Sequence, residues 1–410
     1  MAVLRRFGIR GYKSFRDVEL RLRPIVVLVG PNASGKSNLF DALKLLAGFV
    51  NERTLEAAFE GHRGTPIESF HRAGRTSEEM QRERALRLSF DGDVELSAAT
   101  VARVTDQVRA SSERVASGSV INHRLLRYSV DVELAPTTGR LRVRGECLEA
   151  LRRDAAPKAS RKPFLGRDGT KLHLRREGGG HPYYHELGLD HTVLSEPLYP
   201  PHFAHAVAFR EELARWRGHA LTTADLRWGA AASRVEAVGR TGAGLASFLG
   251  RLGSEHPAEL SRLTARLREL VPSVDGLQVE ADSEGAMQLR MVEQGVPLSA
   301  RVASSGTLRM LGILAAVSPL SGATLVTLEE PERSVHARRL SALVEVLTEA
   351  ASEGGLQVVI STHSSAFASH FPDDAVLVCD KEGWETRFDP FGGSAGQLFR
   401  EAAIEAVVDV

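Results

Sequence analysis

Gly30-Pro-Asn-Ala-Ser-Gly35-Lys36-Ser37 is the stretch that decides the fold. It follows Ile25-Val-Val-Leu-Val29, an apolar run typical of a strand buried on both faces. After it, apolar side chains recur at helical spacing at Leu39, Leu43 and Leu46. A Gly-rich turn between a buried strand and a helix predicts a P-loop, whose backbone N–H groups and helix dipole bind phosphate. A chance Gly-rich turn does not explain this context.

The P-loop predicts ATP and Mg²⁺ as ligands, because its residue types match the separate parts of that pair. Lys36 is expected to contact the β- and γ-phosphates as a catalytic cation, and the Ser37 hydroxyl to bind Mg²⁺. The other positions predicted to surround the nucleotide are Gly30, Asn32, Ser34, Gly35 and Asn38.

A second apolar run ends in acids at Leu325-Val-Thr-Leu-Glu329-Glu330-Pro331-Glu332, the layout of a Walker B motif. Ligands bind at the carboxyl ends of strands in open α/β sheets. Glu329 is therefore predicted to hold the Mg²⁺ shell, and Glu330 to orient or deprotonate the attacking water. Alone, Glu-Glu-Pro-Glu is more typical of a solvated helix start; the preceding strand and the P-loop favour the catalytic interpretation.

His363 ends the next apolar run, Ile360-Ser-Thr-His363-Ser364. A lone histidine at a strand end is more often structural or merely exposed. Following the two Walker motifs, it is predicted to donate a hydrogen bond to the γ-phosphate and so to sense it.

A hydroxyl-rich turn, Ser304-Ser305-Gly306-Thr307, precedes a predicted helix over Met310 to Ala316. Such a turn at a helix N-terminus is a phosphate-binding device, and Ser304, Ser305 and Gly306 are predicted to contact nucleotide. The alternative is a simple helix cap made by one of the two serines.

The alternation of short apolar runs with helical patterns predicts an α/β P-loop NTPase fold, with a mixed sheet flanked by helices. Residues 1–50 and 240–410 are expected to join into one ATPase head. Residues 51–239 are expected to form a mixed α/β insertion, with strands at Ala85–Phe90 and Tyr128–Leu134. Sustained heptads are absent from the sequence, so no long coiled coil is predicted.

Composition and charge limit the partners and the cellular compartment that we expect for this chain. Lys plus Arg and Asp plus Glu are both 52, so the whole-chain charge gives no sign of nucleic acid. Locally, Arg152–Arg176 is basic and a candidate for DNA contact, although such a run is usually a solvated face or meets an acidic partner. Two cysteines and the lack of a long apolar stretch predict a cytoplasmic protein without a membrane span.

These motifs, in this order, resemble the ABC-type ATPases of the RecF and SMC class, close to their stand-alone AAA-like relatives in the OLD-related group. Ile9-Arg-Gly-Tyr-Lys-Ser-Phe15 matches the N-terminal pattern of that class, and Ser304-Ser305-Gly306-Thr307 matches its degenerate signature turn. Glu330-Pro331-Glu332 matches its Walker B extension. The resemblance covers roughly residues 1–50 and 240–380.

The resemblance implies a homodimer that closes on ATP; a higher oligomer is the alternative. Each composite site would combine one protomer's P-loop, Glu329, Glu330 and His363 with the partner subunit's Ser304 and the partner subunit's Gly306. Two positions depart from the family: Val335-His336-Ala337 stands where Leu-His-Pro is usual, and the Q-loop glutamine has only Gln81 and Gln107 as candidates.

The resemblance favours an ATPase switch in antiphage or anti-plasmid defence. Only 47 residues follow His363, too few for the nuclease domain of OLD-type proteins, so a separate effector protein such as a nuclease is expected. The alternative is a RecF-like repair or recombination ATPase that binds DNA directly. A transporter nucleotide-binding domain is disfavoured by the degenerate signature turn and the long middle region.

Overall fold

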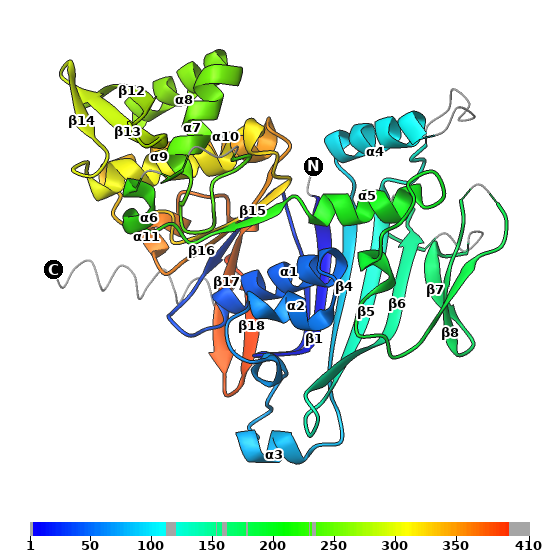
Figure 1. Ribbon diagram of the computed structural model, residues 1–410. Coiled ribbons are helices and arrows are strands. Elements are labelled where there is room, and N and C mark those ends of the chain that lie inside the picture. The colour runs from blue at the N-terminus through cyan, green and yellow to red at the C-terminus, as the bar shows by residue number, and fades with distance from the viewer. Residues whose placement is uncertain are drawn as a thin grey trace.

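The computed structural model describes residues 3–111, 120–152, 154–157, 162–177, 179–228, 230–231 and 235–392. In this part of the chain, a central, mostly parallel sheet lies beside a larger antiparallel sheet, and a small sheet sits on helices at one end (Figure 1). No helix within these ranges is long and apolar enough to cross a membrane.

The central sheet joins the two ends of the chain. Its order is β10-β15-β16-β3-β17-β18, so that β3, from the N-terminal region, lies between two strands from the C-terminal region. The strands from β10 to β17 are parallel, and β18 is antiparallel to β17. The bounds are β3 Ile25–Val29, β10 Trp216–His219, β15 Leu325–Glu329, β16 Gln357–Thr362, β17 Val376–Glu382 and β18 Glu385–Pro390. The predicted α/β class is confirmed.

The alternation of side chains along β3 explains why it is apolar throughout. Val26 and Leu28 pack into one core with helix α1 (Lys36–Asn51), while Val27 and Val29 pack into a second core with α9 and α10 on the opposite face. Burying such a side chain contributes about 1.5–3 kcal/mol, so both faces favour this strand. The helices of the second face are α9 Ser305–Val317, α10 Leu340–Ser352 and α11 Ser365–Ala368.

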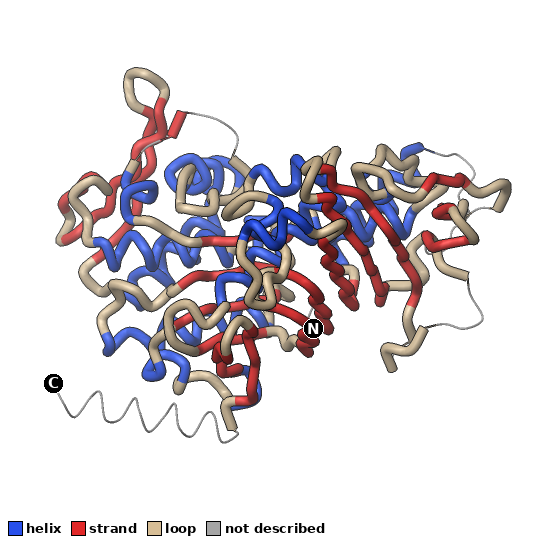
Figure 2. Tube along the Cα trace, turned by 90° about the horizontal axis from the view of Figure 1, so that it is seen from below, coloured by secondary structure: helices blue, strands red, loops and turns tan. Residues whose placement is uncertain are grey.

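The antiparallel sheet has the order β2-β1-β4-β5-β6-β7-β8-β9, and Figure 2 shows it edge on beside the helical part. Its inner face shares a core with α1, α2 and α5. The bounds are β1 Leu4–Tyr12, β2 Phe15–Arg21, β4 Leu86–Glu95, β5 Leu125–Ala135, β6 Arg140–Ala150, β7 Leu165–Asp168, β8 Lys171–Leu174 and β9 Tyr183–Glu186, with α2 Leu55–Glu60, α4 Ala98–Ser111 and α5 Ala204–Leu213.

The region expected to be an insertion takes part in both large sheets. β4 pairs directly with β1, and β10 pairs in parallel with the Walker B strand β15, His219 standing opposite Leu328. Residue 240 therefore does not mark an edge of the central sheet. Trp216-Arg-Gly-His219 is too short and too polar to be recognised as a strand, because its stability comes from pairing with β15 rather than from its own pattern.

The small sheet joins β11, β12, β13 and β14, and packs with α7 and α8 against α9. Together they form the outer end of the molecule in Figure 1. The remaining bounds are β11 Ala230–Ala231, β12 Val274–Ala281, β13 Ala286–Glu293, β14 Val296–Ser299, α3 Ser77–Arg82, α6 Thr223–Arg227, α7 Leu245–Glu255 and α8 Pro257–Leu270.

Candidate nucleotide site

The P-loop connects the end of β3 to the start of α1, and close approaches of the backbone require its two outer glycines. A Cβ on Gly30 would lie 2.0 Å from the Cys379 carbonyl oxygen. Gly35 has φ 106°, and a Cβ there would lie 2.1 Å from the Thr386 hydroxyl oxygen. Only glycine fits both positions, and the resulting curve turns the loop's backbone around the start of the helix.

Lys36 is the first residue of α1 and is buried. Its Nζ donates hydrogen bonds to the carbonyl oxygens of Gly30, at 2.7 Å, and Pro31, at 2.6 Å. Burial lowers the pKa of Lys36, opposed by the nearby Cys379 and Glu330. The ammonium is thus held across the loop that is predicted to take phosphates.

Three residues outside the loop brace it, and two of them were not singled out from the sequence. The Thr386 hydroxyl, from β18, donates to the Ser34 carbonyl oxygen at 2.8 Å and lies 2.7 Å from Ser14 Oγ. Asn38 Nδ2 donates to the same Ser14 Oγ at 2.8 Å. Asn38, predicted to contact nucleotide, is therefore engaged in supporting the loop, while Asn32 is exposed at its tip.

Behind the loop, Asp41 links α1 to its surroundings. Its carboxylate accepts hydrogen bonds from Lys13 Nζ at 2.7 Å and from Arg63 Nε at 3.0 Å. Burial would raise the pKa of Asp41, but the hydrogen bonds from Lys13 and Arg63 outweigh it and hold that pKa below its ordinary value. Arg63 also donates to the Ser37 carbonyl oxygen, which fixes the first turn of the helix.

The predicted catalytic acid and the predicted sensor histidine are brought together. Glu330 follows β15 and His363 follows the neighbouring β16, and Glu330 Oε1 lies 3.0 Å from His363 Nδ1. Both side chains remain partly exposed. Glu329, the preceding acid, instead pairs with Arg240, whose Nη2 lies 3.2 Å from Glu329 Oε1.

Glu330 has a left-handed backbone, with φ 45°, which is unfavourable for a residue with a Cβ. Two hydrogen bonds hold it there: its N–H donates to the Ser361 carbonyl oxygen at 2.8 Å, and its carbonyl oxygen accepts from Arg309 Nη2 at 2.7 Å. Arg309 is buried in α9 and also donates to the Leu221 carbonyl oxygen. Strain at such a position is typical of functional sites.

The third acid, Glu332, points into the protein rather than toward Glu330. It is buried and hydrogen-bonded to the Thr362 hydroxyl, and burial raises its pKa. Its second oxygen, Oε2, is buried without a hydrogen-bond partner among the residues described. Glu332 is thus a structural acid beside a catalytic candidate.

The signature-like turn caps α9. Ser304 is the N-cap, and its Oγ accepts a hydrogen bond from the Thr307 N–H at 3.4 Å. A Cβ on Gly306 would lie 2.4 Å from the Ser334 carbonyl oxygen, so only glycine allows this close approach. In the described ranges, no hydrogen bond or ion pair joins Ser304–Gly306 to the chain's own P-loop.

The basic stretch Arg152–Arg176 lies partly outside the described residues. Its described part forms the β7–β8 hairpin, where Arg167 donates to the Gly169 carbonyl oxygen and Lys171 pairs with Glu186 at 2.8 Å. The two Q-loop candidates lie on different helices. Gln107 of α4 donates a hydrogen bond to Glu211 of α5, and Gln81 lies on the outlying helix α3. Sequence reasoning missed β10 and, with it, His219, the last residue of the strand beside Walker B.

The fold and the P-loop arrangement define an ABC/SMC-like P-loop ATPase. Residues 25–369 match a protein family described as "AAA domain, putative AbiEii toxin, Type IV TA system". The chain belongs to this family. No curated protein sequence matches the chain.

Two solved structures show the same fold at low sequence identity. One is an Smc head bound to the C-winged helix domain of ScpA, with TM-score 0.56 and 10% identity over 94% of this chain and 97% of that one. The other is an Smc head domain with an extended coiled coil, bound to the C-terminal domain of ScpA derived from Pyrococcus furiosus. Its TM-score is 0.54 with 10% identity, over 98% of this chain and 100% of that one.

Proposed function

We propose that this chain hydrolyses ATP to ADP and phosphate, with Glu330 as the general base. The observation that carries the proposal is the Glu330–His363 pair at the ends of two adjacent parallel strands, close enough to Lys36 for electrostatic interaction. The Glu330 carboxylate accepts a proton from the attacking water, and the His363 ring holds that carboxylate in place and contacts the γ-phosphate. Lys36 balances charge on the transferred phosphoryl group.

The residues near the loop fit Mg²⁺. Ser37 supplies a hydroxyl and Glu329 a carboxylate, the oxygen donors that this ion prefers. When bound, the ion neutralises charge on the β- and γ-phosphates. Because Glu329 is paired with Arg240, that ion pair must loosen for Glu329 to reach a metal shell.

We further propose that two copies close head to tail on ATP. The turn at Ser304 makes no polar contact with its own P-loop in the described part of the chain, and an exposed apolar patch lies beside it. Val302 is 75% exposed and Trp228 62%, with Arg301 stacked on the Trp228 ring at 5.1 Å. A patch of this kind beside a phosphate-binding turn suits a second copy of the chain.

In the cell, we propose that this cycle controls a separate effector in antiphage or anti-plasmid defence. The family description, which names a toxin and a toxin–antitoxin system, supports a defence setting. The Smc heads of the same fold are bound to another protein, ScpA, which supports regulation through a partner.

The second candidate is direct DNA binding in the RecF manner. A hollow of about 400 Å³ on the antiparallel sheet is lined by Arg10, Arg87, Arg144 and Arg167. Carboxylates counter it, because Arg10 pairs with Asp17 at 3.0 Å, and Arg87 with Glu133 at 3.1 Å. The basic charge of this face is therefore largely neutralised before DNA arrives.

Steady-state ATP hydrolysis tests the proposal, with Glu330→Gln compared with the same substitution at Glu332. Glu330→Gln should lower kcat by about 10²–10⁴-fold and retain ATP binding, since it removes only the base. Glu332→Gln should retain most of the turnover, because its carboxyl is buried against Thr362. Equal turnover in wild type and Glu330→Gln would exclude Glu330 as the base.

Adding duplex DNA to the same assay separates the two candidates. Stimulation that falls steeply with salt favours direct DNA binding. Turnover that ignores DNA favours control by a protein partner.

A further inference from the structure

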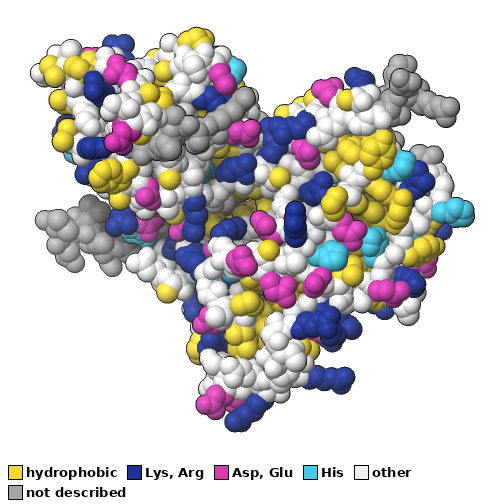
Figure 3. Space-filling model, in the orientation of Figure 1, with side chains coloured by type: hydrophobic (Ala, Val, Ile, Leu, Met, Phe, Trp, Pro, Cys, Tyr) yellow, Lys and Arg dark blue, Asp and Glu magenta, His cyan; other side chains and the backbone are white. Residues whose placement is uncertain are grey.

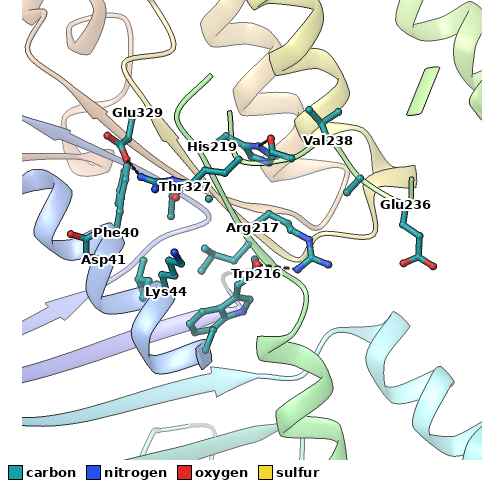
Figure 4. Close-up of a pocket in the computed structure, with 17 residues that line it drawn as sticks. Phe40, Asp41, Lys44, Trp216, Arg217, His219, Glu236, Val238, Thr327 and Glu329 are labelled. Carbon is teal, nitrogen blue, oxygen red and sulfur yellow. Dashed lines mark hydrogen bonds and ion pairs between the residues drawn. The ribbon is translucent and has the colours of Figure 1, made fainter. Parts of the chain in front are cut away.

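A cavity of about 470 Å³ lies beside α1, beyond the Walker B acid Glu329. One wall is α1, the other is the edge strand β10, and the loop of residues 236–240 closes it (Figure 4). Figure 3 shows that this face of the molecule is hollowed at its centre, with Lys and Arg as well as Asp and Glu side chains around the hollow. The P-loop itself does not line this cavity.

The cavity walls are largely apolar. They are formed by Phe40 and Leu43 of α1, Trp216 of β10, Leu325 of β15 and Val238 of the loop. Cavities of this size with apolar walls and a few polar groups are typical of small-molecule sites. A ligand that fills it needs an apolar body.

Three cationic side chains line the cavity: Lys44, Arg217 and Arg240. Lys44 Nζ donates to the Gly61 carbonyl oxygen, and no carboxylate among the described residues forms an ion pair with it. Burial lowers the pKa of Lys44, and the next cause is the charge of Arg240. Because Lys44 and Arg240 line the same cavity, an anion bound between them would reduce their mutual repulsion.

Asp41 and Arg217 of the cavity are already engaged, and the exposed Glu236 points away from Lys44 in Figure 4. Asp41 is held by Lys13 and Arg63, and Arg217 folds back to donate to the Ala214 carbonyl oxygen at 2.6 Å. Arg240 has a single carboxylate partner, Glu329, and is 45% exposed. The polar groups of the cavity that remain available to a ligand are therefore the two cations Lys44 and Arg240.

We propose that this cavity binds a small molecule with a planar apolar body and one anionic group, held by Lys44 and Arg240. Binding draws Arg240 away from Glu329 and frees that carboxylate for the metal shell, so the ligand activates hydrolysis. This regulatory half rests on the proposed ATPase function; the binding site does not.

Fluorescence titration of the full chain with 1-anilinonaphthalene-8-sulfonate tests the site, because this probe carries a planar naphthalene body and one anionic sulfonate. One saturable site is expected. Lys44→Ala and Arg240→Ala should each weaken binding by about tenfold or more, since each removes a charge-assisted contact. Ala47→Phe, which fills the cavity from α1, should abolish it. Arg82→Ala, on the exposed helix α3, is the control and should bind as the wild type does.

Thermal unfolding of each variant checks that it folds. A wild-type protein that does not bind the probe would overturn the proposal. So would folded Ala47→Phe and Arg240→Ala variants that both still bind it. Displacement of the probe by GMP would assign the site to nucleotides, whereas a probe that stays bound in excess GMP would exclude this nucleotide as its ligand.

Turnover tests the regulatory half. The probe should raise the ATPase rate of the wild type severalfold, and Arg240→Ala should raise the basal rate and remove the response to the probe. A wild-type rate that ignores bound probe would overturn the regulation. Absence of any ATP turnover, with probe binding still sensitive to Lys44→Ala, would reject the proposed ATPase function and leave the binding site standing.

Discussion

Glu330 combines a strained backbone with a catalytic candidate side chain, and a buried arginine holds it. Arg309 spans from α9 to the Glu330 carbonyl oxygen, so a direct hydrogen bond joins the helix after the signature-like turn to the candidate catalytic acid. Strain of this kind persists only when the surroundings fix it. A movement of α9 on dimer closure would therefore shift the backbone of Glu330 directly.

Removing that anchor should affect both activity and stability. Arg309→Met leaves the Glu330 and Leu221 carbonyl oxygens without their buried donor, and we expect a loss of about 2 kcal/mol in the free energy of unfolding. Misplacement of Glu330 should lower kcat by about tenfold or more, with ATP affinity unchanged. Chemical denaturation and steady-state kinetics of the same preparation measure the two effects; unchanged kcat in folded protein would reject the anchoring role.

His219 should make stability depend on pH. Burial lowers the pKa of His219 to about 4 from an ordinary 6.5. Between these values the unfolded chain binds the proton that the folded chain rejects, so stability is full above pH 6.5 and is lost as the pH falls toward 4. His219→Gln keeps a donor for the Gly239 carbonyl oxygen and should reduce the slope of unfolding free energy against pH in this window. Equal slopes in both proteins would contradict the assignment.

At the scale of the elements, the P-loop is held by parts of the chain far away in sequence. Thr386 of β18 and Ser14, between β1 and β2, meet under the loop, where Thr386 donates to the Ser34 carbonyl oxygen. The loop's shape is therefore fixed by the sheet edge as well as by its own glycines.

Thr386→Val tests this support, because valine keeps the shape and removes both hydrogen bonds. We expect ATP affinity to fall by about tenfold and stability by about 1–3 kcal/mol, since the Ser34 carbonyl oxygen loses its hydroxyl donor and keeps only the weaker one, the Cys379 thiol at 3.4 Å. Titration with ATP under non-hydrolysing conditions gives the affinity. Thr386→Ser, which restores the hydroxyl, should recover most of it; a valine variant with wild-type affinity would show that the loop supports itself.

The central strands were predictable from sequence because each carries its own signal. β3 and β15 are apolar runs followed by a Gly-rich turn and by acids respectively, and both were placed within one residue. β10 was not, because Trp216–His219 has no pattern of its own and depends on β15. Glu330 and His363 were placed in one site from the rule that parallel strands end at the same edge.

The contacts that support the site could not be predicted from the sequence, for a different reason. Arg309, Thr386 and Arg240 reach their partners across 21, 352 and 89 positions respectively. No local spacing encodes such distances. The domain boundaries at residues 50 and 240, and the roles of the site residues, remain predictions.

At the scale of the whole molecule, the apolar patch beside the signature-like turn should be an interface between two copies. Val302→Asp places a charge at its most exposed apolar position, so we expect ATP-driven association to weaken by about tenfold or more while ATP binding to the single chain is retained. Sedimentation of the ATP-loaded protein over a range of concentrations measures the effect. Val296→Asp, farther along the β13–β14 hairpin, shows how far the interface extends. If Val302→Asp leaves association unaffected, the interface lies elsewhere on the molecule.

The central claim is that ATP bound at Lys36 closes two copies and that hydrolysis through Glu330 releases them. Light scattering of Glu330→Gln with and without Mg-ATP tests it most directly, since this variant should bind ATP without cleaving it. We predict a single chain without nucleotide and a dimer with ATP, with no dimer from the double variant Lys36→Ala, Glu330→Gln. A Glu330→Gln protein that binds ATP and stays monomeric at all concentrations would contradict the account.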